Sequence, residues 1–123
     1  QMCIRDRYQG IEVGWLPEGY ELVESDAPDR VILRRYIKSS SGVKSSIDVR
    51  AISFFDEGVF KVDTEADQIY QVSVQNTLAT VVQKEECVQI TWMYPKSNCI
   101  VTLYGDNIST ETALRIAQSI VLS

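Results

Sequence analysis

The chain has 123 residues, which is enough for one domain with its own core, and its 45% hydrophobic and 24% charged residues are typical of a globular protein. A formal net charge of −5 argues against a nucleic-acid-binding surface, which needs a clustered basic face. Histidine is absent, so serine–histidine and cysteine–histidine nucleophilic sites are excluded within this chain, and carboxylate, lysine or tyrosine chemistry remains.

The first ten residues are predicted to be a non-native or disordered leader. Met2 to Arg7 (MCIRDR) resemble a translated sequencing-adapter remnant at the head of a truncated metagenomic reading frame. On this interpretation the true N-terminus is missing, and a signal peptide or membrane anchor is lost with it. We expect residues 11–123 to form a single α+β domain.

The stretch from Gly14 to Tyr20 (GWLPEGY) combines two aromatic residues, a proline and two glycines. Pro17 favours the first central position of a turn, with Glu18 at the second and Gly19 at the exit. We predict that this opening corner is structural and that Trp15 folds back over a sheet edge or over the flank of a helix. A ligand or partner contact remains the alternative for Trp15 and Tyr20.

Alternation of apolar and polar residues predicts antiparallel strands over most of the remaining chain. The predicted strands are Tyr20–Glu24, Arg30–Lys38, Val43–Phe55, Gln68–Gln75, Leu78–Lys84, Cys87–Tyr94 and Cys99–Tyr104. A polar loop over residues 39–42 joins the second strand to the third.

The register of the last two strands can be predicted, because residues 95–98 close them into a hairpin. The predicted pairs are Tyr94 with Cys99, Trp92 with Val101, and Ile90 with Leu103. These residues then share one face, and a slip by one residue would destroy the match. In this register Cys87 and Cys99 lie too far apart for a disulfide, so we expect two small apolar residues, with Cys99 inside and Cys87 near a turn.

A helix is predicted at the C-terminal end. Ser109 is a good N-cap, and Glu111 lies in the first turn, where the helix dipole favours an anion. The apolar face comprises Ala113, Ile116, Ala117 and Ile120. The expected fold class is α+β: a single curved antiparallel sheet of about six or seven strands, covered on one face by this helix.

The sharpest polar cluster is the acidic segment that runs from Asp56 and Glu57 to Asp63, Glu65 and Asp67. Asp63, Glu65 and Asp67 alternate as the oxygen ligands of a calcium loop do, but the glycine and the closing glutamate of an EF-hand loop are missing. We therefore favour a solvated acidic loop over a cation site, and we predict no metal.

Two aromatic residues are candidates for a ligand pocket, namely Trp92 and Tyr94. Their predicted face is also where core residues belong, so the core interpretation is preferred for Trp92, while Tyr94 needs a partner for its hydroxyl if it is buried. No two carboxylates are fixed on either side of a cleft. We therefore predict no enzymatic activity, no catalytic residue and no cofactor.

Four short segments, taken in order, are similar to a known family. They are LPEGY (Leu16–Tyr20), ITW (Ile90–Trp92), LYGDNIS (Leu103–Ser109) and ALRIAQSI (Ala113–Ile120). Over about residues 11–121 the chain resembles the domain of unknown function family numbered 4367. The resemblance implies a bacterial domain outside the membrane, behind an N-terminal transmembrane segment, in some cases in regulators encoded near sigma factors. It implies no catalytic residues.

The leading functional hypothesis is a non-enzymatic extracytoplasmic module that senses a ligand or contacts a protein partner, with the membrane reached only through the missing anchor. The alternative is a carrier that binds a small apolar ligand or lipid on the concave sheet face under the helix, and this alternative predicts an apolar cavity near Trp92. A carboxylate hydrolase is the third hypothesis and predicts two acids converging in one cleft.

Overall fold

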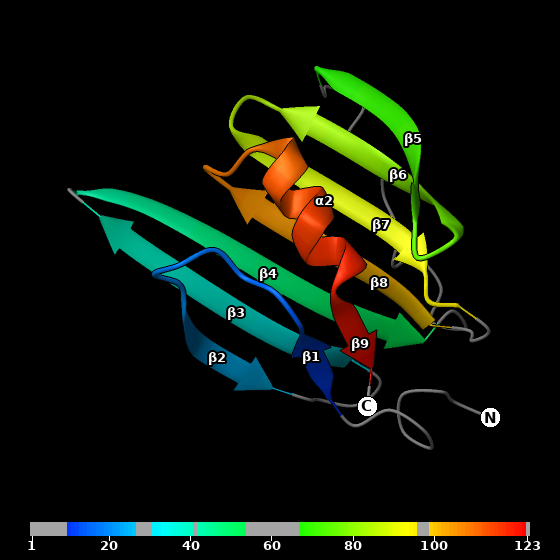
Figure 1. Ribbon diagram of the computed structural model, residues 1–123, viewed down its shortest axis with the longest axis horizontal. Helices are drawn as coiled ribbons and strands as arrows, with labels where there is room; N and C mark the ends of the chain where they lie inside the picture. Colours follow the sequence, from blue (N-terminus) through cyan, green and yellow to red (C-terminus); the bar gives the residue numbers. More distant parts are fainter. Residues whose placement is uncertain (1–9, 27–30, 41, 54–66, 96–98, 123) are drawn as a thin grey trace.

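A computed structural model describes residues 10–26, 31–40, 42–53, 67–95 and 99–122 (Figure 1). The elements in chain order are β1 (Ile11–Val13), β2 (Glu21–Asp26), β3 (Val31–Ser40), β4 (Val43–Ser53), β5 (Gln68–Val74), β6 (Thr77–Lys84), β7 (Cys87–Met93), β8 (Cys99–Asp106), α2 (Thr110–Gln118) and β9 (Ile120–Leu122). No helix in these ranges is long and apolar enough to cross a bilayer.

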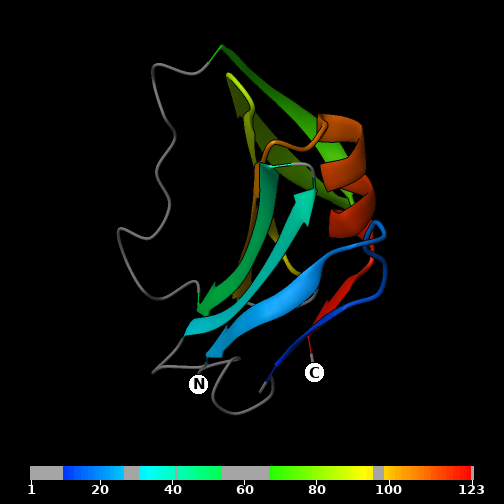
Figure 2. The ribbon, with the colours of Figure 1, turned by 90° about the vertical axis from the view of Figure 1, so that its left-hand side faces the viewer.

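Seven of the strands form one open antiparallel sheet in the order β2-β3-β4-β8-β7-β6-β5. β1 and β9 form a separate two-stranded antiparallel sheet. Seen edge-on, α2, β1 and β9 all lie on the same side of the large sheet (Figure 2). The predicted fold class, an antiparallel sheet covered on one face by a C-terminal helix, is confirmed.

The hairpin of β7 and β8 has the predicted register. Trp92 pairs with Val101 and Ile90 with Leu103, and the backbone N–H of Tyr94 donates to the carbonyl of Cys99 at 2.9 Å. Cys87 pairs with Asp106 at the far end of the hairpin and is a free, exposed thiol, so it does not bridge to the buried Cys99.

The helix begins as predicted. The hydroxyl of Ser109 accepts a hydrogen bond from the backbone N–H of Thr112 at 3.1 Å, which satisfies one of the free donors of the first turn. The side chains that α2 buries against the sheet are Ala113, Ile116 and Ala117. They pack on apolar residues from β3, β4 and β5 to β8, which form one core cluster.

The helix ends earlier than the sequence pattern indicates. Ser119 caps it, with its hydroxyl donating to the carbonyl of Ile116 at 2.7 Å and its N–H donating to the same oxygen at 3.0 Å. Ile120 is buried as predicted, but it lies in β9, which pairs with β1. Placing Ile120 on the helix was therefore wrong. A buried residue shortly after a helix can fall at the next apolar position of the helical period, so the spacing of apolar residues does not show where the helix ends.

The opening corner folds back on the end of α2. The backbone N–H of Gly14 donates to the carbonyl of Ser119 at 3.0 Å, and the N–H of Trp15 donates to the Ser119 hydroxyl at 3.0 Å. The Arg115 guanidinium lies 4.1 Å from the centre of the Trp15 ring, a cation–π contact. Trp15 therefore covers the flank of the helix, as predicted.

The turn in this corner lies one residue later than predicted. Its central residues are Glu18 and Gly19, and Gly19 has φ of +98°. A positive φ is required at the second central position of a type II turn, and glycine adopts it without a steric penalty. This requirement places Gly19, and not Glu18, at that position.

Candidate functional site

The two faces of the large sheet differ in what covers them. One face packs against α2. On the other face lies no helix or strand of the described ranges, and we call it the open face in that sense (Figure 2). One cross-strand row of the open face runs through all seven strands. It consists of Glu24, Arg35, Asp48, Tyr104, Gln89, Val82 and Ile69.

The first three residues of this row, Glu24, Arg35 and Asp48, are linked by ion pairs. Arg35 donates to both carboxylate oxygens of Asp48, from Nε to Oδ1 and from Nη2 to Oδ2, each at 2.9 Å. Its Nη1 donates to Oε1 of Glu24 at 2.9 Å. The hydrogen bonds and charge of Asp48 raise the pKa of Arg35. These pairs are partly exposed and add little stability, so their main effect is to fix the guanidinium and the carboxylate in a bidentate geometry.

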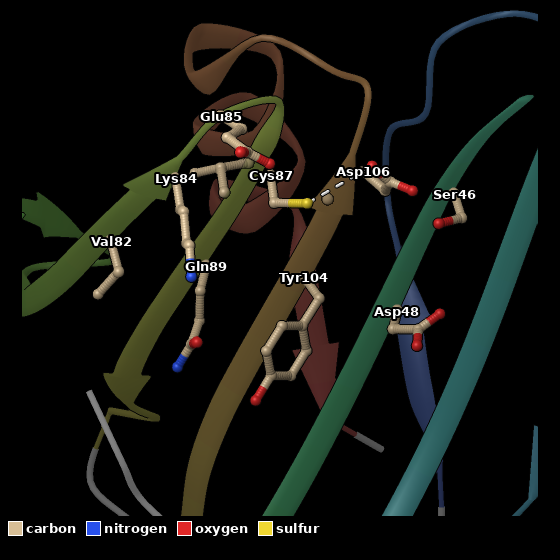
Figure 3. A pocket seen from close by; sticks show the side chains of 11 residues that line it. Ser46, Asp48, Val82, Lys84, Glu85, Cys87, Gln89, Tyr104 and Asp106 are labelled. Atoms are coloured by element: carbon tan, nitrogen blue, oxygen red, sulfur yellow. Dashed lines mark hydrogen bonds between the residues drawn. The ribbon is translucent and has the colours of Figure 1, made fainter. Parts of the chain in front are cut away.

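A hollow of about 370 Å³ lies in the middle of the row, between β4, β8, β7 and β6 (Figure 3). Its lining residues are Ser46, Asp48, Val82, Lys84, Glu85, Cys87, Val88, Gln89, Tyr104, Gly105 and Asp106. Tyr104 is 40% exposed, and the Arg50 guanidinium lies 5.6 Å from the centre of its ring. Val82 is buried although it lies on the open face, so the hollow combines apolar and polar surface.

The hollow continues around the turn that joins β6 to β7. A second, more open hollow there is lined by Lys44, Glu85, Glu86, Cys87, Asp106 and Asn107. Glu85 has φ of +56°, and its N–H donates to Oδ2 of Asp67 at 2.8 Å, which holds the turn in place. Three carboxylates and two lysines thus surround this end of the open face, because Lys84 lines the first hollow and Lys44 the second.

Cys87 places a thiol in the lining of both hollows, and a thiol is a nucleophile when it is deprotonated. Partial burial raises the pKa of its thiol, and the hydrogen bond to Asp106 and the negative charges of Asp106, Glu85 and Glu86 raise it further. The Sγ donates to Oδ1 of Asp106 at 3.5 Å, a pair that Figure 3 draws as a dashed line. The thiol is therefore protonated at neutral pH, which is the opposite of the environment that activates a catalytic cysteine.

Metal binding gains no support from the described part of the chain. Within it, no group of three or more histidine, cysteine, aspartate or glutamate side chains could hold a metal ion. Asp63 and Glu65 lie outside the described residues, while Asp67 is exposed and accepts the N–H of Glu85. Cation binding by the segment Asp63 to Asp67 stays untested, and our prediction of a solvated loop stays a prediction.

The structure spreads the four predicted contact residues over separate places. Trp15 is half-buried under Arg115, and Tyr20 is half-buried with the Lys38 ammonium 5.8 Å from its ring centre. Trp92 is 2% exposed inside the core, and its indole N–H has no hydrogen-bond acceptor among the described residues. The Tyr94 hydroxyl accepts the N–H of Leu122 at 3.3 Å. None of these four residues lines the hollows of the open face described above.

Sequence reasoning did not single out the residues of the open-face hollow. Asp48, Gln89 and Tyr104 stand at the polar positions of alternating strands, which alone indicate only a solvated face. Arg35 and Asp48 carry opposite charges on neighbouring strands of one hairpin, but the loop predicted over residues 39–42 would set Arg35 opposite Ser46. They oppose each other because the pairing of β3 with β4 extends to Ser40 and Val43.

Comparison with known families gives one result. The sequence matches the family described as "Domain of unknown function (DUF4367)" over residues 10–120. No curated protein matches the chain significantly. The match includes all four segments on which the resemblance was based, and the predicted resemblance is confirmed.

Proposed function

The chain belongs to the DUF4367 family, and from this premise we propose that it is a non-enzymatic binding module on the extracytoplasmic side of a bacterial membrane-anchored protein. The resemblance drawn from the sequence implies this placement, behind an N-terminal anchor, in regulators of which some are linked to sigma factors. In such a protein the domain senses its surroundings by contact with a protein partner. We assign that contact to the open face of the sheet.

The observation that carries this proposal is the hollow of the open face beside the fixed Glu24–Arg35–Asp48 chain. Arg35 is held by two carboxylates and Arg50 lies over the ring of Tyr104, so both cations are engaged within the domain. The rim at the β6–β7 turn has three acidic and two basic side chains, namely Glu85, Glu86, Asp106, Lys44 and Lys84. A partner segment with basic and apolar side chains fits this combination best.

The chemistry of the lining residues favours binding over catalysis. Asp48 is occupied by a bidentate arginine, the Cys87 thiol is kept protonated, and the chain has no histidine to act as a base. The remaining groups are the charged side chains of the rim together with hydrogen-bonding and apolar side chains, most of them on regular strands, and they suit recognition of a surface.

The carrier hypothesis places the ligand on the other face, beside Trp92. That side chain is packed in the core, and the hollows described above lie on the opposite face of the sheet. We therefore favour a protein contact on the open face over an apolar ligand under the helix.

A peptide titration tests the proposed binding face. We expect a short peptide of lysine and phenylalanine to shift the backbone amide resonances of Gln89, Tyr104 and Asp106 in the ¹⁵N-labelled domain, and we expect weaker binding after Asp106→Asn because a rim charge is lost. The same peptide with glutamate in place of lysine should shift them much less.

The matched control is Glu12→Gln, which removes an exposed charge in β1 on the other side of the sheet and should leave the affinity unchanged. Equal binding of both peptides, or shifts confined to α2 and β9, would contradict the assignment.

A further inference from the structure

The large sheet has two edge strands, β2 and β5, and the two differ in how they are protected. β2 has the sequence ELVESD, with three carboxylates in six residues, and its pairing with β3 is interrupted by a bulge between Leu22 and Glu24. Charges and bulges are the usual devices that prevent an edge strand from pairing with another chain. β2 is therefore a protected edge.

β5 has none of these devices. Its sequence, QIYQVSV, contains no charged residue, no proline and no glycine, and it pairs with β6 in unbroken register from Gln68 to Val74. Ile69 is 50% exposed, and Gln68, Gln71 and Ser73 are exposed as well. An uncharged edge with unbroken pairing, rich in β-branched residues, is a template for a further strand.

The turn after β5 shows which backbone groups point outward. Gln75 and Asn76 have φ of +53° and +65°, as a two-residue type I′ hairpin requires, so the flanking Val74 and Thr77 bond each other. Alternation then directs the N–H and C=O groups of Ile69, Gln71 and Ser73 away from β6. The side chain of Gln118 confirms this direction, because its Nε2 donates to the carbonyl of Ser73 at 3.1 Å.

Gln118 also limits how much of the edge is available. Its Oε1 accepts the N–H of Gln75 at 3.0 Å, so the end of β5 near the turn is covered by α2. The outward backbone groups of Ile69 and Gln71 have no partner within the described ranges. The available part of the edge is thus centred on Tyr70.

We propose that β5 is a self-association edge, at which β5 of a second copy pairs antiparallel about a two-fold axis through Tyr70. In this register Ile69 lies opposite Gln71 of the second copy. Each of the two residues donates its outward N–H to the outward C=O of the other, so these backbone groups gain the partners that they lack in one copy. The two seven-stranded sheets become one continuous sheet, with both copies of α2 on the same side. The hydrogen bonds of Gln118 remain in place.

Two arguments, one from charge and one from packing, favour a second copy of this chain as the partner that pairs with β5. The chain carries a net charge of −5, so two copies repel each other overall, and pairing through β2 would bring the carboxylates of Glu21, Glu24 and Asp26 from both copies close together. Pairing through β5 brings no two charged residues together, because the strand itself is uncharged and Asp67, directly before it, lies opposite Ser73 of the second copy. Tyr70 and Val72 already pack against the core, and the Tyr70–Tyr70 pair extends that apolar layer across the junction. This inference is independent of the open-face binding proposal.

The test is the molar mass of the domain as a function of concentration, measured by sedimentation equilibrium. We expect the mass to rise from monomer to dimer, and we expect Ile69→Lys to stay monomeric at concentrations where the unmodified domain is a dimer, because two ammonium groups then lie close to the junction. Gln71→Pro should do the same. Proline there removes only an outward N–H, and edge strands tolerate this because the bonds to β6 are kept.

The matched control is Val23→Lys on the protected edge. Val23 is 53% exposed, close to the 50% of Ile69, and this variant should dimerise like the unmodified domain. Far-ultraviolet circular dichroism confirms that each variant is folded. The proposal is overturned if the unmodified domain is monomeric at millimolar concentration, or if the folded Ile69→Lys and Gln71→Pro variants still dimerise. An extended partner peptide that protects the amides of Ile69 and Gln71 in a monomeric domain would also overturn self-association.

Discussion

Replacing Trp92 with alanine should lower the free energy of unfolding by about 3–5 kcal/mol, the range for removing a large aromatic side chain from a core. Trp92 is 2% exposed and is the largest of the fully buried side chains among the described residues. It packs in the cluster that joins the sheet to α2. Chemical denaturation monitored by circular dichroism measures the change.

Trp92→Phe is the matched control for this substitution. Phenylalanine keeps much of the buried aromatic surface and removes the indole N–H, which is buried without an acceptor among the described residues. Because an unsatisfied buried donor is costly, Trp92→Phe should destabilise the domain much less than Trp92→Ala. If Trp92→Ala costs less than about 1 kcal/mol, the side chain does not fill a close-packed core, and a ligand pocket beside it becomes the better interpretation.

Gly14→Ala should lower the free energy of unfolding by about 1–3 kcal/mol, as expected for overpacking. A Cβ atom at this position would lie 2.9 Å from the carbonyl oxygen of Ser119, a backbone atom that cannot rotate away. The same oxygen accepts the N–H of Gly14, so the opening corner must move to relieve the clash. Denaturation gives the loss of stability, and a shift in tryptophan emission reports the displacement of Trp15 from Arg115.

Glu18→Ala is the control for Gly14→Ala, because Glu18 is exposed in the same corner and its loss should change stability by no more than about 0.5 kcal/mol. Unchanged stability and unchanged emission in Gly14→Ala would show that the corner is not docked on the end of the helix.

The parts of the fold that the sequence predicted are those where two independent patterns agree. The register of β7 and β8 follows because Ile90 and Trp92 must share a face with Val101 and Leu103, and only one register does this. The start of α2 follows because the cap at Ser109 coincides with the onset of the apolar period.

The parts that escaped prediction depend on contacts between distant segments. β1 and β9 have three residues each, too few to show a period, and they are paired with each other across nearly the whole chain. The end of α2 is fixed by Ser119, whose carbonyl and hydroxyl also receive the N–H groups of Gly14 and Trp15. Such contacts leave no local signal in the sequence.

The candidate site was missed for a related reason. Aromatic residues on the apolar face, such as Trp92 and Tyr94, attract attention in a sequence, but this face is filled by α2 and by core side chains. Alternation shows that Asp48 and Tyr104 point the other way, yet it does not show that α2, β1 and β9 all lie on one side. Which face stays open is decided only by the tertiary structure.

The central claim is that this domain acts by binding through the open face of its sheet. The most direct measurement places the photoreactive residue p-benzoylphenylalanine at Tyr104, or at Val121 as a control, in the full-length protein expressed in cells, and irradiates the cells. The two positions are 40% and 47% exposed and lie on opposite faces of the large sheet. The account predicts a specific cross-linked product from position 104 and none from position 121. A product from position 121 alone would contradict it.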